Sequence, residues 1–182
     1  MFNCGNFVRN GYINILTIYA DIGRTEMATK GEKTIWGIHA GRTGDADNLF
    51  LKHNVIALGW VEMGDVSSLA ADRETFKTKL MKVRPDRKPG YYPTAGGQLF
   101  RFIHETKNGD LVIYPSKHDH RIHIGEIVGK YQYDTKPEPE YPQHRAVKWL
   151  KTFPGQGFPK GRYTRSAQLW LFFKSKTMPK NF

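Results

Sequence analysis

The feature that most limits the fold is a series of short apolar segments that do not alternate regularly with helices. Short runs of β-branched and aromatic residues, bounded by glycine or proline, are typical of β-strands. The segments of this kind are 34–40, 55–60, 110–115, 121–132 and 145–150. Because helices do not follow each strand in turn, the pattern argues against a doubly wound parallel sheet.

Helical periodicity is confined to a few segments. Apolar residues recur every three or four positions in 72–84 and in 95–105, where Thr94 is placed to cap the helix. A short helix is also expected around 49–52, and the glycines within 121–132 indicate a bend or bulge in that strand. We therefore expect an α+β fold: a small curved, mostly antiparallel β-barrel with two or three helices packed outside.

The chain has 182 residues, enough for one domain with tails, and its only cysteine is Cys4. One cysteine forms no internal disulfide, which favours a reducing, cytoplasmic location. No apolar run approaches the ~20 residues that a membrane-spanning helix needs. We expect residues 1–32 to be an N-terminal extension, with Met27 as the biological start, and 33–160 to be the folded domain.

The charge is strongly positive and uneven. The formal net charge is +11, and residues 136–182 contain ten basic and two acidic side chains. Basic charge concentrated in one segment favours a nucleic acid as partner, although a solvated basic tail gives the same count.

Two patterns suggest metal chemistry. Asp86, Glu105 and Lys107 match a loose Pro-Asp…Glu-x-Lys nuclease pattern, in which two acids hold a divalent metal. The pattern needs the acids on adjacent strands, whereas Glu105 falls at the end of a predicted helix. His118, His120 and His123 could be metal ligands, but a closed zinc site needs four. We expect no metal, no cofactor and no catalytic activity in this chain, and keep the nuclease as an alternative.

Aromatic residues form the remaining pattern. Trp36, Trp60 and Tyr114 lie within or at the ends of predicted strands. Strand ends of a small barrel converge, so these rings would form a box for an extruded nucleobase, with Ser116 and Lys117 at its rim. The alternative is that all three are core residues.

A family resemblance appears at these same positions. The chain resembles the amino-terminal domain that precedes the nuclease domain in Mrr-type bacterial restriction proteins, and more distantly the EVE and YTH branch of the PUA-like fold. The motifs that carry the resemblance are Ile35–Gly41, Gly44–Phe50, Ile56–Trp60, Gly64–Ser67, Gly109–Pro115, Ile124–Tyr131 and Arg145–Trp149.

The resemblance implies a PUA-like reader of modified bases in DNA restriction, accompanied by an endonuclease domain or subunit. Its base-binding pocket would include Trp36 and Gly37, with Trp60, Tyr114 and Ser116 as further candidates. Basic residues in the matching region would contact phosphates: Lys117, Arg121, Lys130, Arg145, Lys148 and Lys151. An RNA reader of the same fold stays open as an alternative, because nothing in the sequence distinguishes ribose from deoxyribose.

The carboxyl-terminal segment departs from the family pattern. Residues 161–182 form an atypical basic tail, and the expected nuclease domain does not follow. A truncated or frameshifted gene would explain both features.

Overall fold

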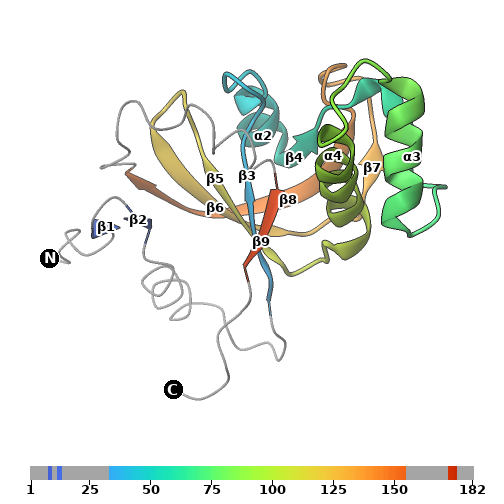
Figure 1. Ribbon diagram of the computed structural model, residues 1–182. Helices are drawn as coiled ribbons and strands as arrows, with labels where there is room; N and C mark the ends of the chain where they lie inside the picture. Colours follow the sequence, from blue (N-terminus) through green and yellow to red (C-terminus); the bar gives the residue numbers. More distant parts are fainter. Residues whose placement is uncertain (1–7, 10–11, 14–32, 155–171, 176–182) are drawn as a thin grey trace, which may run out of the picture.

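The computed structural model describes residues 8–9, 12–13, 33–154 and 172–175. Its main feature is a seven-stranded mixed sheet that curls into a half-barrel (Figure 1), with strand order β4-β8-β6-β5-β3-β9 and β7 paired to β8. These strands are β3 (Ile35–Ile38), β4 (Val55–Leu58), β5 (Leu111–Pro115), β6 (Arg121–Ile127), β7 (Gln132–Tyr133), β8 (Gln143–Pro154) and β9 (Phe172–Ser175). A separate two-stranded pair consists of β1 (Val8–Arg9) and β2 (Tyr12–Ile13).

The curl originates in the long strand β8. Its residues 143–146 pair with β4, whereas 147–154 pair with β6, so one strand serves two parts of the sheet. The register shifts between Ile124 and Gly125, as the glycines had indicated. A Cβ atom on Gly125 would lie 2.9 Å from the Trp149 ring and 2.4 Å from Val147, so only glycine fits here.

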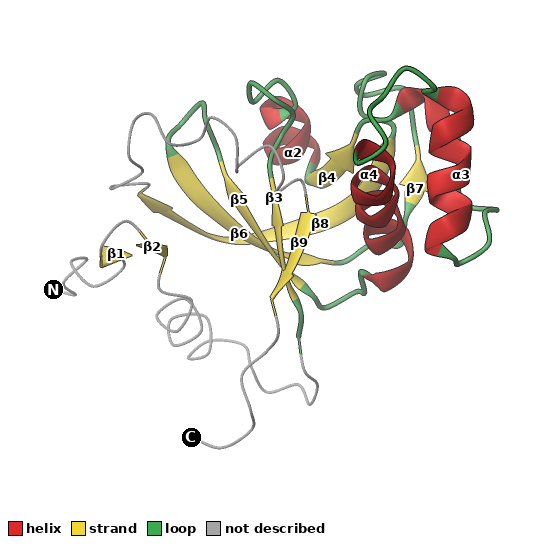
Figure 2. Ribbon diagram, viewed as in Figure 1, coloured by secondary structure: helices red, strands yellow, loops and turns green. Residues whose placement is uncertain are grey.

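The described residues contain three α-helices: α2 (Asp47–His53), α3 (Arg73–Val83) and α4 (Tyr91–Phe100). A 3-10 turn, η2 (Val61–Met63), follows β4, and a π-helical turn, η3 (Arg101–Glu105), continues α4. All three helices pack into one core with one face of the sheet (Figure 2). The α+β half-barrel with three helices agrees with the sequence expectation at this level.

Both faces of the central strands are apolar. Strand side chains alternate, so Trp36, Val112 and Tyr114 enter the core beneath the helices. The residues between them belong to a second cluster on the opposite face: Ile35, Leu111, Ile113, Ile122 and Ile124. Burial on both faces explains why these strands read as continuous apolar runs.

The sheet is mostly antiparallel, as expected: among its described strand pairs, β3 with β5 is the parallel one. Two details differ from the sequence expectation. Helix α4 begins at Tyr91, so Thr94 lies inside it, and its hydroxyl donates to the Gly90 carbonyl, 3.3 Å away, instead of capping a later start. Residues 172–175 were assigned to the tail, but they pair with β3 at the edge of the sheet. The remaining residues of 1–32 and 161–182 lie outside the described part.

Candidate functional site

Three loops meet beside the start of α2. The Lys117 ammonium donates to the Arg42 carbonyl at 2.5 Å, which joins the loop after β3 to the β5–β6 turn. The Tyr141 hydroxyl, from the segment before β8, donates to the Asp45 carboxylate. We call residues 39–47, 116–121 and 138–142 the loop cluster. Residues far apart in the sequence thus form one surface.

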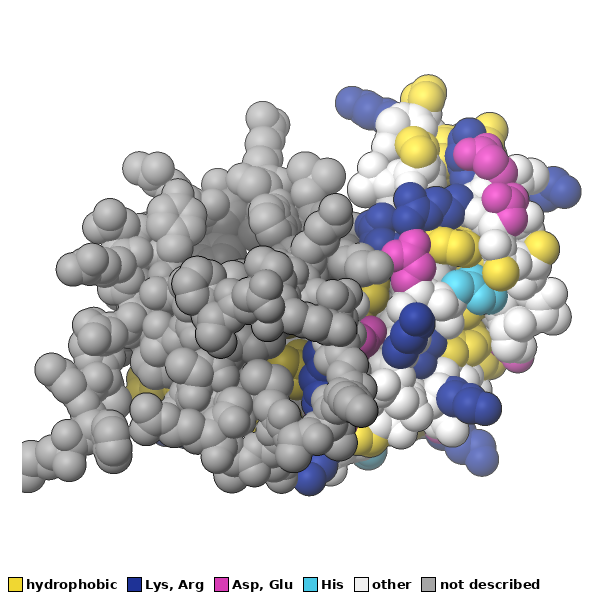
Figure 3. All heavy atoms as spheres, turned by 90° about the horizontal axis from the view of Figure 1, so that it is seen from below, with side chains coloured by type: hydrophobic (Ala, Val, Ile, Leu, Met, Phe, Trp, Pro, Cys, Tyr) yellow, Lys and Arg dark blue, Asp and Glu magenta, His cyan; other side chains and the backbone are white. Residues whose placement is uncertain are grey.

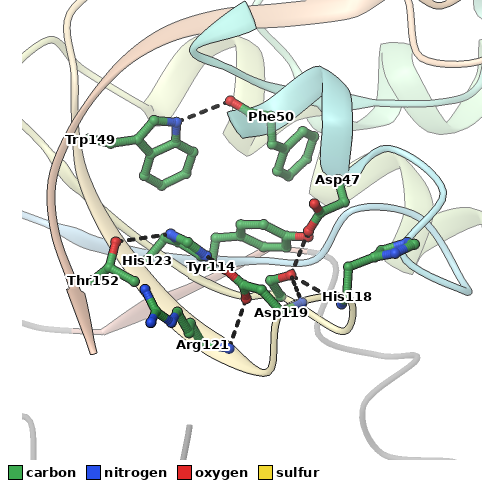
Figure 4. Close-up of polar contacts among 10 residues, drawn as sticks. Asp47, Phe50, Tyr114, His118, Asp119, Arg121, His123, Trp149 and Thr152 are labelled. Atoms are coloured by element: carbon green, nitrogen blue, oxygen red, sulfur yellow. Dashed lines mark hydrogen bonds and ion pairs between the residues drawn. The ribbon is translucent and has the colours of Figure 1, made fainter. Parts of the chain in front are cut away.

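Asp47 connects α2 to the β5–β6 turn (Figure 4). Its Oδ1 accepts hydrogen bonds from the Tyr114 hydroxyl and the Ser116 hydroxyl, each at 2.5 Å. The Ser116 Oγ in turn accepts from the backbone N–H groups of His118 and Asp119, at 3.1 and 3.3 Å. Burial, and then the hydrogen bond to Asp47, raise the pKa of Tyr114, so the phenol keeps its proton. The turn is therefore held in place by a neutral phenol and one carboxylate.

His123 lies at the centre of a second set of contacts in the same close-up. Its Nε2 is 3.0 Å from Asp119 Oδ2, and its Nδ1 is 3.1 Å from the Thr152 hydroxyl (Figure 4). The ring stacks on Tyr114 and meets the Trp149 ring edge-on. His123 and Thr152 are direct partners in the β6–β8 ladder, so their contact follows from the strand register. Both ring nitrogens of His123 therefore have partners within the protein, whereas the sequence left open that His123 binds a metal ion.

Asp45 and His39 lie at the other side of the loop cluster. Burial alone would raise the pKa of Asp45, but hydrogen bonds from Tyr141 and Thr43 hold it at about 2. His39 Nδ1 lies 2.6 Å from the Gly41 carbonyl, and burial lowers the pKa of this histidine. A side chain on Gly41 would collide with the Tyr141 hydroxyl and the Asp45 carboxylate, so the loop is tightly fitted.

Trp60 has an unusual backbone. Its φ of 59° is in the left-handed region, which bulky residues rarely adopt and which costs ~1–3 kcal/mol. Its indole N–H donates to the Tyr91 hydroxyl at 2.6 Å, and its ring is half-buried. The preceding Gly59 lies against the Glu140 carbonyl, which brings the end of β4 to the loop cluster. Backbone strain of this kind is concentrated at functional sites.

The three predicted pocket aromatics have separate partners. Trp36 is 0% exposed, and its indole N–H donates to Asp110 at the start of β5, at 2.8 Å. Tyr114 is 1% exposed and bonds to Asp47 at the opposite end of β5. Gly37 and Ser116 are buried as well. The rings of Trp36 and Tyr114 therefore belong to the core, as the alternative interpretation of the sequence had it. Of the three aromatic residues, Trp60 is half-buried.

The predicted phosphate contacts do not form one group. Lys117 and Arg121 are exposed in the loop cluster, whereas Lys130 and Lys148 are exposed elsewhere and Lys151 is half-buried. Seen from below, lysine and arginine side chains are spread over the described surface and stand beside acidic ones (Figure 3).

Arg145 differs from these lysines. It is 5% exposed, and its guanidinium donates to the carbonyls of Phe102, Ile103 and Gly129. The alternating pattern of 145–150 indicated an exposed basic face, but η3 covers this part of β8. Arg145 is a structural residue here, and this corrects its assignment to phosphate binding.

The nuclease residues are also separated. Glu105 pairs with Arg73, at the start of α3, with an N–O distance of 2.6 Å, whereas Asp86 lies beyond the end of that helix. An eleven-residue helix spans ~16 Å, so the two acids lie toward opposite ends of α3. Lys107 is exposed in the turn before β5. Among the described residues there is no group of three His, Cys, Asp or Glu side chains suited to a metal ion.

The sequence named Asp45 and Asp47 only as candidate caps of the short helix, whose N-cap is Ala46 without a side-chain hydrogen bond. It did not assign His39, Asp45, Asp47 or Tyr141 to a site, because no spacing rule links loops that meet only in the fold. The described part contains no helix with the length and apolar character to cross a bilayer.

Comparison with known proteins identifies a family without assigning an activity. A family model described as a domain of unknown function, DUF8426, matches residues 36–169. Comparisons with curated proteins and with solved structures found no significant match. Since the family model covers well over half of the chain, from β3 to the segment before β9, this protein belongs to the DUF8426 family.

Proposed function

We propose that this chain is a DNA-binding module with a PUA-like half-barrel, which recognises a modified base extruded from the duplex. The restriction context and the PUA-like identity rest on the sequence resemblance. The observation that carries the binding proposal is the half-buried, backbone-strained Trp60 beside a loop cluster with exposed cations. An accompanying endonuclease domain or subunit would carry out cleavage.

The loop cluster contains three cations and five acidic side chains, so phosphate binding there would depend on individual cations and not on the net charge. Arg42, Lys117 and Arg121 are exposed there. The carboxylates nearby already accept hydrogen bonds: Asp45 from Tyr141 and Thr43, Asp47 from Tyr114 and Ser116, and Asp119 from the Arg121 backbone. The cations are consequently the groups best able to meet phosphates, which give affinity but little sequence information.

Trp60 would supply the selectivity. Stacking of a base on an aromatic side chain contributes ~1–3 kcal/mol, comparable to the cost of extruding the base. Tyr91 orients the indole through its hydroxyl, so the ring is fixed before a ligand arrives. A preformed aromatic surface reduces the entropy lost on binding.

The test is a panel of short duplexes that differ in one base, plain or modified, measured at several salt concentrations. We expect tighter binding of one modified duplex, and a roughly 5- to 150-fold loss of that preference in Trp60→Ala. Lys117→Ala should weaken all duplexes similarly and reduce the salt slope by ~0.9. Val61→Ala, an exposed apolar neighbour of Trp60, and Lys82→Ala, on α3, are matched controls.

Thermal melting of each variant separates lost binding from lost folding. The proposal fails if no duplex binds, or if a folded Trp60→Ala variant keeps the full preference. Tighter binding of the matching ribo-oligonucleotides would instead identify an RNA reader of the same fold.

A further inference from the structure

The turn between α3 and α4 is a basic segment that lies close to Trp60. Residues 84–88 contain three basic side chains and one acidic side chain. The hydroxyl of the buried Tyr92 lies 2.8 Å from the Arg84 carbonyl and 3.0 Å from the Arg87 carbonyl, so it can donate to both. These contacts hold the backbone of the turn against α4, which fixes the position of its side chains.

Arg87, in this turn, is linked to the indole of Trp60 through one tyrosine. The indole N–H donates to the Tyr91 hydroxyl at 2.6 Å, and the Arg87 guanidinium lies over the Tyr91 ring, 5.7 Å from its centroid. Stacking on a ring restricts a guanidinium and leaves the N–H groups at its edge for a further partner. The described link between Trp60 and the loop cluster is less direct, because it runs through Gly59 and the Glu140 carbonyl. The cation joined most closely to the strained indole is therefore Arg87.

The acidic side chains around the turn leave two cations able to bind an anion. The Glu62 carboxylate, from η2, is paired with Arg84. Asp86 is the acid beside Arg87, but its Oδ2 is 3.6 Å from the arginine Nε, which is beyond hydrogen-bond distance. Arg87 is exposed, and so is Lys88, which forms no ion pair within the described part of the chain. The guanidinium edge of Arg87 and the Lys88 ammonium can thus donate to a ligand.

The Tyr91 hydroxyl adds a third donor at the same place. Its oxygen accepts the indole N–H of Trp60, whereas its own proton has no acceptor among the described residues. The side chain is half-buried. A neutral O–H group beside two cations suits an anion with several acceptor oxygens. A phosphodiester is such an anion, and the forked N–H groups of arginine match its oxygens in pairs.

We propose that Arg87 and Lys88 bind the phosphates that flank the base stacked on Trp60, an inference that rests on the proposed function above. In a nucleotide one sugar separates the base from its phosphate, and in this protein one tyrosine separates the indole from the guanidinium. The protein would then bind one nucleotide by its base and by its backbone. The sequence did not predict these two phosphate contacts, because Trp60 and Arg87 are brought together only by the fold.

The experiment is a double-mutant cycle between the turn and the DNA backbone. The probe is the tightest-binding duplex of the panel above, with either natural phosphates or uncharged methylphosphonates at the two positions that flank the varied base. Methylphosphonates should weaken wild-type binding about tenfold and leave the affinity of the double variant Arg87→Met, Lys88→Met nearly unchanged. Each single variant should lower the salt slope by ~0.9. Lys107→Met is the charge-matched control, because Lys107 is exposed near Glu105, at the opposite end of α3.

The outcomes separate the two proposals. A wild-type protein that binds both probes equally refutes the phosphate contacts, and this comparison needs no variant. A methylphosphonate effect as large in the folded double variant as in the wild type refutes them too, as does a salt slope that stays unchanged in both single variants. If Trp60→Ala still loses the base preference in these cases, the proposed function stands with its phosphate contacts elsewhere. Absence of binding to every duplex refutes both.

Discussion

Replacing Arg145 by methionine tests the assignment of this arginine to the fold rather than to phosphate binding. Its Nε donates to the Phe102 carbonyl at 2.7 Å, its Nη2 to the Ile103 carbonyl at 2.7 Å, and its Nη1 to the Gly129 carbonyl at 3.1 Å. The carbonyls of Phe102 and Ile103 belong to η3, and the Gly129 carbonyl follows β6. Arg145 therefore ties η3 to β8 and to the turn after β6.

The expected loss of stability follows from the three carbonyl acceptors of Arg145. Each buried carbonyl that loses its hydrogen bond from the arginine costs ~1–3 kcal/mol, and removing the buried charge returns part of its desolvation cost. Taking the lower bound for each carbonyl, we expect Arg145→Met to lower the free energy of unfolding by about 3 kcal/mol. For a chain of this size that corresponds to a decrease in Tm of about 6–12 °C.

Urea unfolding followed by tryptophan fluorescence measures this loss. Lys148→Met is the matched control, because Lys148 is exposed on the same strand, and its effect should stay within about 0.5 kcal/mol. An Arg145→Met variant as stable as the control, with weakened DNA binding and a smaller salt slope, would contradict the structural role and restore the phosphate contact.

Two further predictions concern packing and pH. Gly125→Ala places a methyl group 2.4 Å from Val147 and should lower the free energy of unfolding, measured in urea, by about 1–3 kcal/mol. Gly90→Ala is the control and should change it little, because the new Cβ has no neighbour within 4 Å. Equal effects of the two substitutions would contradict the close packing at Gly125. Burial lowers the pKa of His39, His104 and His144 in the folded protein. As the pH falls, these histidines are protonated first in the unfolded chain, so the free energy of unfolding should decrease below about pH 6.5. A urea midpoint that is unchanged or higher at pH 5.5 than at pH 7.5 would contradict this effect.

Local chemistry made most of the secondary structure predictable. The β-branched and aromatic residues of 35–38 and 111–115 favour strands in almost any context, and alternation places successive side chains on opposite faces. Helix α3 could be located from its apolar period and from Asp72, whose side chain accepts from the Thr75 N–H at 3.0 Å. The bulge followed from the glycines of β6. These features depend on neighbours along the chain, which a sequence shows directly.

The roles of individual side chains depended on the tertiary structure. Trp36 and Trp60 look equivalent in the sequence, yet Trp36 is enclosed in the core and Trp60 is half-buried on a strained backbone. From the sequence, Arg145 is predicted to be a surface cation, but η3 covers it. Asp47 meets Tyr114 and Ser116 only because the fold brings α2 beside the β5–β6 turn. Burial and long-range partners are set by how the sheet curls and which loops it brings together. Propensity and periodicity carry no information about those contacts, because they are local properties of the chain.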